Sequence, residues 1–300
     1  MPEISGIDAW INSKPLTLKN LKGKVVLVDF WTYTCINCIR TIPYIKDWHK
    51  KYSKLGLVII GLHTPEFEFE KKLENVKQAV KKFSLKYPIA LDNDYQTWKS
   101  FSNHYWPAKY LFNKDGKLVY THFGEGNYAE TELRIRESLK ALGHSKQLEK
   151  IKLVTEPRPK FHFGITPETY CGSSRNEGLG SSAVCLPDGT CKYIDPGAHQ
   201  RDVIYLSGDW EQASEYLETQ ADKPSYIAIK YRGSEINLVI HPPSKKSVTA
   251  KVYVDGKLKK SIKLDAPKMY NLYKSKKPEE HDLKLVLESK GVRCYAYTFG

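Results

Sequence analysis

Residues 25–38 of this 300-residue chain read VVLVDFWTYTCINC. An apolar run leads into two cysteines separated by two residues, and a helical pattern that contains Pro43 follows them. A buried strand that feeds a C-x-x-C motif at the start of a helix is typical of a dithiol redox site. Because a helix N-terminus favours an anion, we expect Cys35 to be the nucleophile and Cys38, one turn further on, to be the resolving thiol.

Other interpretations of the C-x-x-C pair are weaker. Zinc would need four ligands, and the chain has neither a second C-x-x-C motif nor a pair of histidines at zinc-finger spacing. The remaining cysteines lie far along the chain, at Cys171, Cys185, Cys191 and Cys294. A purely structural bridge is disfavoured, because a two-residue loop at a helix start gives a strained and reducible disulfide. The sequence therefore predicts neither a metal site nor a bound cofactor.

Asp29 stands six residues before Cys35 on the predicted strand. Burial disfavours the charged form of a carboxyl group, so we expect the pKa of Asp29 to rise toward neutrality. Such a group can accept the proton of a cysteine during turnover. The alternative is an acid at the end of the strand that caps the following helix.

The length of the chain fits two domains. The net charge is +13 and the pI about 9.2, but the excess lysines are spread along the chain. The lysines between Lys71 and Lys86 alternate with apolar residues at helical spacing. This pattern predicts that they form the solvent-exposed face of an amphipathic helix from about Phe67 to Phe83. The chain carries no RNA-binding or helix-turn-helix signature, so we do not expect nucleic acid as a partner.

No apolar stretch approaches the length of a membrane span, and residues 1–5 lack the basic and apolar regions of a signal peptide. The sequence thus indicates either a cytosolic protein or a soluble piece whose targeting segment lies outside it. Four cysteines beyond the C-x-x-C pair favour an oxidising compartment.

Strand and helix patterns alternate over residues 1–150, which predicts an α/β fold around a mixed sheet. A continuous apolar run at 57–62 predicts a strand buried on both faces. Residues 151–170 have the character of a linker, with Glu156-Pro157-Arg158-Pro159 as its clearest part. Strand patterns dominate residues 171–300, which predicts an all-β, jelly-roll-like sandwich.

Two further disulfides are expected in the second domain. Cys185 and Cys191 flank a Pro-Asp-Gly turn, which brings its ends together. Cys171 begins the sandwich and Cys294 lies in its last predicted strand, and such strands are often neighbours. Cys171–Cys294 is therefore the second expected bridge, and four buried, reduced thiols are the alternative.

Several segments of the chain resemble the DipZ-type, TlpA-like thioredoxins, specifically the extracytoplasmic C-terminal half of DipZ proteins. The resemblance covers nearly the whole chain and is carried by residues 23–38, 63–66, 87–93, 106–108, 123–126, 166–170, 206–210 and 295–300. It implies a thioredoxin-like fold followed by a sandwich similar to a carbohydrate-binding module. It also implies protein disulfides as substrates, an extracytoplasmic or periplasmic location, and a CcdA-like membrane protein as electron donor.

The resemblance also implies roles for residues around the cysteines. Asp29 matches the acid that takes the proton of the second cysteine, and Trp31 matches the aromatic residue that packs beneath the site. Pro107 matches a proline held in cis opposite the cysteines, beside which the backbone of Trp106 would pair with an extended substrate. Thr41 departs from the wider pattern, which tends to have Glu at this position.

His63 and Glu66 follow the apolar strand 57–62. They are therefore expected at the edge of the sheet where the cysteines also lie, as contributors to a substrate groove. The alternative is that they only form the turn that follows the strand.

The leading functional hypothesis is a thiol–disulfide oxidoreductase. The pair Ile36-Asn37 lacks the histidine of strongly oxidising relatives, which favours a reductant. The alternative is a glycan- or partner-binding protein with an accessory thioredoxin domain, in which aromatic residues stack on sugars. Four candidates for such stacking are Tyr170, Trp210, Tyr226 and Tyr231. An exposed row of these rings would favour binding, and their burial would favour a scaffolding role.

Overall fold

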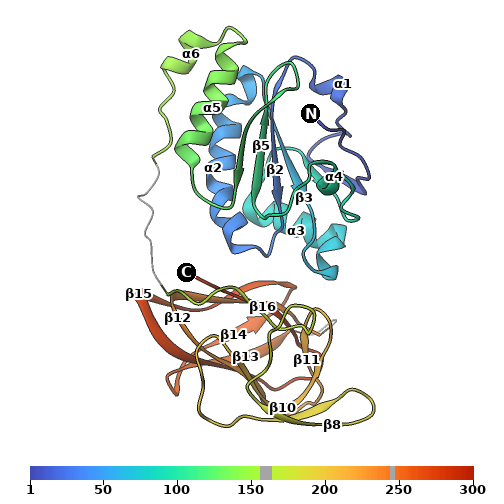
Figure 1. Ribbon diagram of the computed structural model, residues 1–300, viewed down its shortest axis with the longest axis vertical. Helices are drawn as coiled ribbons and strands as arrows, with labels where there is room; N and C mark the ends of the chain where they lie inside the picture. Colours follow the sequence, from blue (N-terminus) through green and yellow to red (C-terminus); the bar gives the residue numbers. More distant parts are fainter. Residues whose placement is uncertain (156–163, 244–246) are drawn as a thin grey trace. The chain divides into compact units, whose positions relative to one another are not determined.

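A computed structural model describes residues 1–155, 164–243 and 247–300 of the chain (Figure 1). The chain divides into two units, Met1–Pro159 and Lys160–Gly300. This division falls inside the predicted linker 151–170, of which residues 156–163 lie outside the described part.

Both ends of the predicted linker pack on the unit next to them. The backbone N–H of Val154 donates to the Glu132 carboxylate at 2.5 Å, in the first unit. The backbone N–H of Thr166 donates to the Arg232 carbonyl at 2.9 Å, in the second unit. Each unit therefore extends into the region that the sequence predicts as a linker.

The first unit is a mixed sheet flanked by helices (Figure 1). Its strands are β1 (Ala9–Ile11), β2 (Val25–Trp31), β3 (Leu57–His63), β4 (Ile89–Leu91), β5 (Ala108–Phe112) and β6 (Leu118–Phe123). Its helices are α1 (Leu18–Leu21), α2 (Ile36–Tyr52), α3 (Leu73–Phe83), α4 (Gln96–Ser100), α5 (Tyr128–Lys140) and α6 (Ser145–Glu149), with 3-10 helices η1 (Ser53–Leu55) and η2 (Glu68–Lys71). The strand order is β1-β4-β3-β2-β5-β6, with β2, β3 and β4 parallel, and the predicted thioredoxin-like fold is confirmed.

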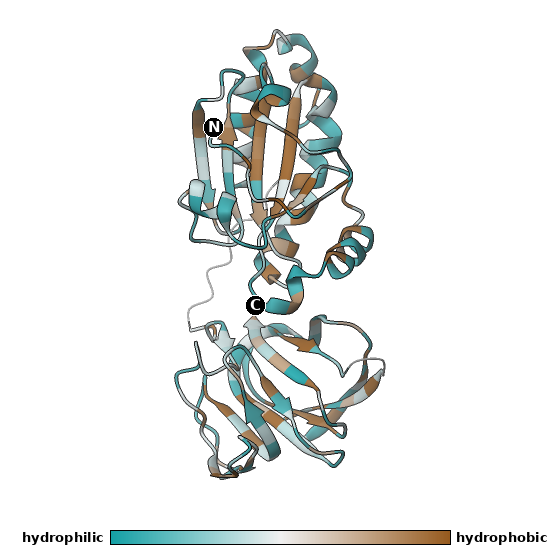
Figure 2. Ribbon diagram, turned by 90° about the vertical axis from the view of Figure 1, so that its right-hand side faces the viewer, coloured by the Kyte–Doolittle hydropathy of each residue, from teal (hydrophilic) through white to brown (hydrophobic). Residues whose placement is uncertain are grey.

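Strand β2 lies inside the sheet between β3 and β5, and all seven of its residues are buried. Val26, Val28 and Phe30 belong to a core that also contains residues of α4 and of the N-terminal segment. Because side chains alternate along a strand, Asp29 points to the opposite face of the sheet. Figure 2 shows, in brown, that the central strands of this unit are largely hydrophobic.

Helix α2 starts where β2 ends, as the C-x-x-C pattern predicts. Cys35 is its N-cap residue, and Pro43 lies in its interior. The last turn gives way to the 3-10 helix η1, and Gly56 adopts a φ of 96° before β3 begins. Helix α5 lies beside α2 (Figure 1), with the rings of Tyr44 and Tyr128 stacked at a centroid distance of 3.6 Å.

The predicted single helix over residues 67–83 is instead two pieces. The 3-10 helix η2 covers Glu68–Lys71, Lys72 is extended with φ −70° and ψ 115°, and α3 begins at Leu73. The apolar spacing of residues 73–83 is correctly helical. Upstream of the break, Phe69 and Glu70 are both buried, so this segment is not part of a solvent-exposed helix face.

The second unit is all β. Its strands are β7 (Thr169–Tyr170), β8 (Ser182–Cys185), β9 (Cys191–Ile194), β10 (Ile204–Gln212), β11 (Leu217–Thr219), β12 (Ser225–His241), β13 (Val248–Val254), β14 (Lys257–Leu264), β15 (Lys268–Leu287) and β16 (Arg293–Phe299). The strands form one hydrogen-bonded sheet, in which the long strand β12 pairs with β10, β15 and β16. An apolar core that includes Trp210 and Tyr231 packs against this sheet. The jelly-roll connectivity stays a prediction.

One of the two predicted bridges is formed. Cys185 and Cys191 lie opposite each other on β8 and β9 and are joined by a disulfide. Cys171 and Cys294 are both free thiols and fully buried, so the second predicted bridge is absent from this structure. Both thiols lie in the buried core of this unit, and the Cys171 N–H donates to the carbonyl of Tyr295, the residue that follows Cys294.

The cysteine states can be checked by alkylation without reductant. We expect Cys171 and Cys294 to resist iodoacetamide in the folded protein, since neither side chain is exposed, and to be modified once the protein is denatured. Cys185 and Cys191 should stay unmodified in both conditions, which peptide mapping would show. Denatured protein in which Cys171 and Cys294 stay unmodified would contradict the structure and restore the second bridge.

Candidate active site

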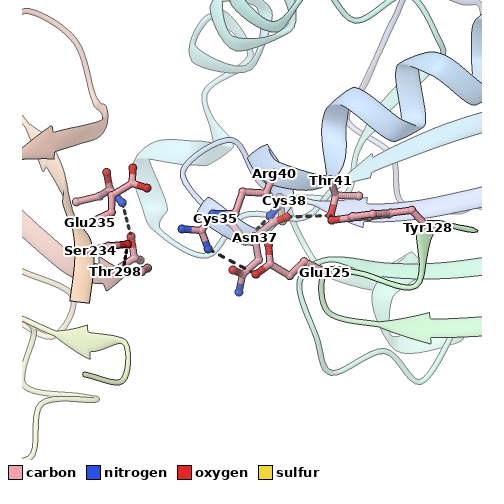
Figure 3. Close-up of polar contacts among 12 residues, drawn as sticks. Cys35, Asn37, Cys38, Arg40, Thr41, Glu125, Tyr128, Ser234, Glu235 and Thr298 are labelled. Atoms are coloured by element: carbon pink, nitrogen blue, oxygen red, sulfur yellow. Dashed lines mark hydrogen bonds and ion pairs between the residues drawn. The ribbon is translucent and has the colours of Figure 1, made fainter. Parts of the chain in front are cut away.

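The two cysteines of the motif differ in exposure. Cys35 is partly exposed at the N-terminus of α2, and its Sγ accepts the backbone N–H of Cys38 at 3.2 Å (Figure 3). Cys38 lies one turn inside the helix and is 2% exposed. Burial, together with a hydrogen bond to Cys35, raises the pKa of the Cys38 thiol well above its usual range. Cys35 is therefore the cysteine that a substrate can reach.

Asp29 lies beneath the cysteines on β2 and is 3% exposed. Burial raises its pKa to about 7, and the nearby Lys109 ammonium partly opposes this shift. The Asp29 carboxylate in turn contributes to the raised pKa of Cys38. Among the described residues, its Oδ1 has no hydrogen-bond partner. The carboxyl group thus lies close to the resolving thiol with a proton affinity suited to exchange at neutral pH.

Sequence reasoning missed Lys109. This residue is fully buried and stands opposite Asp29 in the pairing of β2 with β5. Its ammonium group donates to the Gly124 carbonyl at 3.1 Å. The sequence shows a lysine next to the apolar run 110–112, which is unusual for a buried strand. Only the pairing of β2 with β5 shows that this lysine faces the Asp29 carboxyl group.

The structure places Trp31 and His63 in the core rather than in a groove. Their exposed fractions are 1% and 0%, and their rings meet edge to face at 5.3 Å. The His63 ring also stacks on Tyr33 at 5.7 Å, and burial lowers the pKa of His63 to about 3. Neither side chain can touch a protein substrate, so the predicted groove role of His63 is wrong. Trp31 packs beneath the site instead of binding a substrate.

Glu66 is half-buried in the turn after β3. Its backbone N–H donates to the carboxyl group of Glu70 at 2.6 Å. Glu70 is fully buried and also accepts the hydroxyl group of Thr34, the residue before Cys35. Sequence reasoning missed Glu70 because it was assigned to the exposed helix over 67–83.

The loop before β5 has the backbone conformation that the resemblance implies. The Trp106–Pro107 peptide bond is cis, and the Pro107 carbonyl accepts the Gly124 N–H at 2.8 Å. The indole of Trp106 donates to the Thr64 carbonyl at 3.1 Å and lies 4.3 Å from the Trp98 ring. Within the described residues, the backbone N–H and C=O of Trp106 have no hydrogen-bond partner. They are therefore able to pair with another chain.

Thr41 points toward helix α5, from the position where the wider pattern has Glu. Its hydroxyl donates to the Asn37 carbonyl at 2.9 Å and lies 3.2 Å from the Tyr128 hydroxyl (Figure 3). Near the same helix start, Arg40 forms an ion pair of 3.5 Å with Glu125. Thr41 thus links the start of α2 to Tyr128 and adds no charge beside Cys38.

The described residues contain no group of three or more His, Cys, Asp or Glu side chains arranged to hold a metal ion. None of the helices in those same ranges is long and apolar enough to cross a membrane.

These positions support one kind of chemistry, the exchange of disulfides through a partly exposed thiol backed by a buried thiol and a buried acid. The chain is of the thioredoxin-like thiol–disulfide oxidoreductase class. It belongs to the family of the thiol-disulfide oxidoreductase ResA of Bacillus cereus, to which it is 34% identical over 122 residues, covering 41% of this chain and 68% of ResA.

The comparisons extend to both units. Residues 1–135 match the Redoxin family, and residues 166–300 match the family described as Thioredoxin like C-terminal domain. Protein DipZ of Mycobacterium bovis is 34% identical over 303 residues, which covers 100% of this chain and 42% of DipZ. The predicted resemblance to DipZ-type proteins is confirmed, and the chain spans less than half the length of these relatives. A solved thioredoxin-like protein in the oxidised form is 30% identical, with a TM-score of 0.44, covering 47% of this chain and 95% of that protein.

The burial of Asp29 makes a prediction about stability and pH. Because its pKa is raised from 3.8 to about 7, the folded protein binds more protons than the unfolded chain between these values. The contribution of Asp29 to stability is therefore present at acid pH and is lost as the pH rises toward 7 and above. In reduced Asp29→Asn protein, we expect the free energy of unfolding, relative to the parent, to improve by up to about 4 kcal/mol between pH 4 and pH 8.

Urea unfolding at several pH values, followed by tryptophan fluorescence, measures this difference. Five of the six tryptophans lie in the first unit, so the signal reports mainly on it. Parallel pH curves for parent and variant would contradict a carboxyl group with a raised pKa at this position.

Proposed function

We propose that this chain is a reductant of protein disulfides in an extracytoplasmic compartment. The observation that carries the proposal is the contrast between the partly exposed Cys35 thiol and the buried Cys38 thiol beside Asp29. The thiol at the surface can attack a target disulfide, and the thiol in the interior can then release the target from the mixed disulfide.

The reaction has two steps. The Cys35 thiolate attacks one sulfur of the target disulfide, which forms a mixed disulfide and releases the other target sulfur as a thiolate that takes up a proton. Cys38 then passes its proton to the Asp29 carboxylate and attacks the Cys35 sulfur. A Cys35–Cys38 disulfide forms, the second target thiol leaves, and two electrons have moved to the target.

The cis-proline loop supports binding of an extended substrate. The backbone of Trp106 has unpaired groups within the described residues, and its side chain is held by Thr64 and Trp98. A target segment that pairs with this backbone would be oriented by main-chain hydrogen bonds, independent of its sequence. Trp106 and Pro107 are thus proposed as the substrate-binding residues.

Further observations support the proposed direction of electron flow, the electron donor and the compartment. Ile36 and Asn37 bring no positive charge to the helix start, so the reduced form is not specially stabilised, which supports a reductant. The Cys185–Cys191 disulfide supports an oxidising compartment. By resemblance to DipZ-type proteins, a CcdA-like membrane protein would restore the Cys35 and Cys38 thiols.

A glycan-binding role receives no support from the aromatic residues. Trp210 and Tyr231 are fully buried in the core of the second unit. The face of the Tyr170 ring is covered by Arg175 at 3.6 Å, and that of Tyr226 by Lys284 at 4.1 Å. These rings do not form an exposed row, and their packing favours a scaffolding role.

Trapping tests the assignment of the two thiols. A Cys38→Ser variant mixed with a disulfide-bonded protein should accumulate a mixed disulfide on Cys35, because the resolving thiol is missing. A Cys35→Ser variant should form none, since Cys38 is buried, and both variants should lose catalytic turnover by about a hundredfold or more. Non-reducing gels and peptide mapping identify the linked cysteine. A mixed disulfide that forms on Cys38 instead would reverse the two roles.

A further inference from the structure

A second buried carboxyl group is hydrogen-bonded to the residue that precedes the nucleophile. Glu70 belongs to the 3-10 helix η2, which follows β3, and its exposed fraction is 0%. Burial raises its pKa to about 7. The reaction described above does not use this residue.

The Glu70 carboxyl group joins two segments that are far apart in the sequence. Its Oε1 accepts the Thr34 hydroxyl at 2.5 Å. Its Oε2 accepts the backbone N–H of Glu66 at 2.6 Å and that of Phe67 at 3.1 Å. These bonds connect the loop before Cys35 to the turn that follows β3. Strand β3 is the neighbour of β2 in the sheet.

Part of this pattern is local turn structure. The bonds from Glu66 and Phe67 would satisfy the start of η2 without any role in catalysis. The bond from Thr34 has no such local purpose, because it spans 36 residues and both partners are buried. A carboxyl group taken fully out of water is expensive unless it is hydrogen-bonded. An apolar residue could fill this space at lower cost if packing were its only task.

We propose that Glu70 is a positioning residue for Cys35, whose carboxyl group holds Thr34 and so fixes the geometry from which Cys35 attacks a disulfide. This inference rests on the proposed function of Cys35 as the nucleophile.

The link from Thr34 to the nucleophile is the backbone itself. Thr34 directly precedes Cys35, whose extended backbone (φ −74°, ψ 118°) makes it the N-cap of α2. In this conformation the Cys35 sulfur accepts the Cys38 N–H at 3.2 Å. A Thr34 side chain that is released from Glu70 would let the strand–helix junction move, and the sulfur would lose its fixed direction. Misplacement of a reacting group by even about 1 Å can lower the rate of attack by as much as a hundredfold.

The experiment measures the attack step alone. In a Cys38→Ser background, Cys35 attacks the disulfide of DTNB, forming one mixed disulfide and releasing one coloured thionitrobenzoate anion. The Cys35→Ser, Cys38→Ser double variant gives the background rate from other thiols. Into the Cys38→Ser parent we would introduce Glu70→Gln, Thr34→Val, both together, and Thr34→Ser.

We expect Glu70→Gln to slow the reaction about fivefold or more, because its amide oxygen can keep the two backbone N–H bonds but its NH2 group cannot accept the Thr34 hydroxyl, so the bond to Thr34 is lost or reversed and no longer involves a carboxylate. Thr34→Val keeps the volume and removes the hydroxyl, so it should slow the attack by a similar factor. The combination of Glu70→Gln and Thr34→Val should react no more slowly than either change alone, because both changes disrupt the same bond. Thr34→Ser retains the hydroxyl and should restore the rate to within about twofold.

Glu132→Gln provides a matched control in the same unit. Glu132 is also fully buried and accepts the Tyr52 hydroxyl and the Val154 N–H, both at 2.5 Å. Tyr52 is the last residue of α2, about 26 Å along the helix from Cys35. This variant should lose stability and keep the DTNB rate.

The outcomes are distinct. An unchanged rate in Glu70→Gln and Thr34→Val, in a parent that reacts normally, would overturn the role of Glu70 and leave the proposed function intact. Equal slowing by Glu132→Gln would also overturn it, because general loosening would then explain the effect. A parent that releases no thionitrobenzoate above background would overturn both proposals.

Discussion

The burial of strand β2 is the constraint on which the rest of the site depends. Because β2 is paired on both sides and covered on both faces, none of its side chains can reach water. Asp29 is therefore forced into an apolar layer, where the charged form of its carboxyl group is disfavoured and its pKa rises to about 7. The opposing Lys109 limits this rise, so that the group can still ionise near neutral pH.

The same strand also determines where the cysteines lie. The chain leaves β2 at Trp31 and enters α2 after Cys35, so the first cysteine is at the surface and the second is beneath the first turn. One local feature, a buried strand followed at once by a helix, thus produces both the exposed nucleophile and its buried resolver. The hydrogen bonds from the turn after β3 to the junction, through Glu70 and Thr34, belong to the same arrangement.

The parts of the structure that depend on neighbouring residues could be predicted from the sequence. The β2–α2 junction, the order of Cys35 and Cys38, and the burial of Asp29 follow from apolar runs and spacing within about fifteen residues. Cys185–Cys191 could be predicted because a short turn separates the two thiols. The cis bond before Pro107 was implied only by the resemblance to a family.

What could not be predicted depends on contacts across the chain. Lys109 and Glu70 are partners of residues 80 and 36 positions away, and no local pattern reveals such a partner. Cys171 and Cys294 lie on neighbouring segments, as expected, but both are free thiols. For His63 the signal was present, since it follows an apolar run typical of a strand buried on both faces. It was assigned to a groove because strand ends often carry binding residues.

The central claim is that the Cys35–Cys38 pair is a reducing centre, and its reduction potential tests this most directly. The reduced protein would be equilibrated with mixtures of reduced and oxidised glutathione at pH 7, and the fraction of the dithiol would be measured by alkylation and mass spectrometry. We expect a midpoint near that of thioredoxin, about −270 mV, because neither Ile36 nor Asn37 brings a positive charge between the two cysteines and the buried Cys38 remains a thiol. A midpoint near that of the strong oxidant DsbA, about −120 mV, would contradict it.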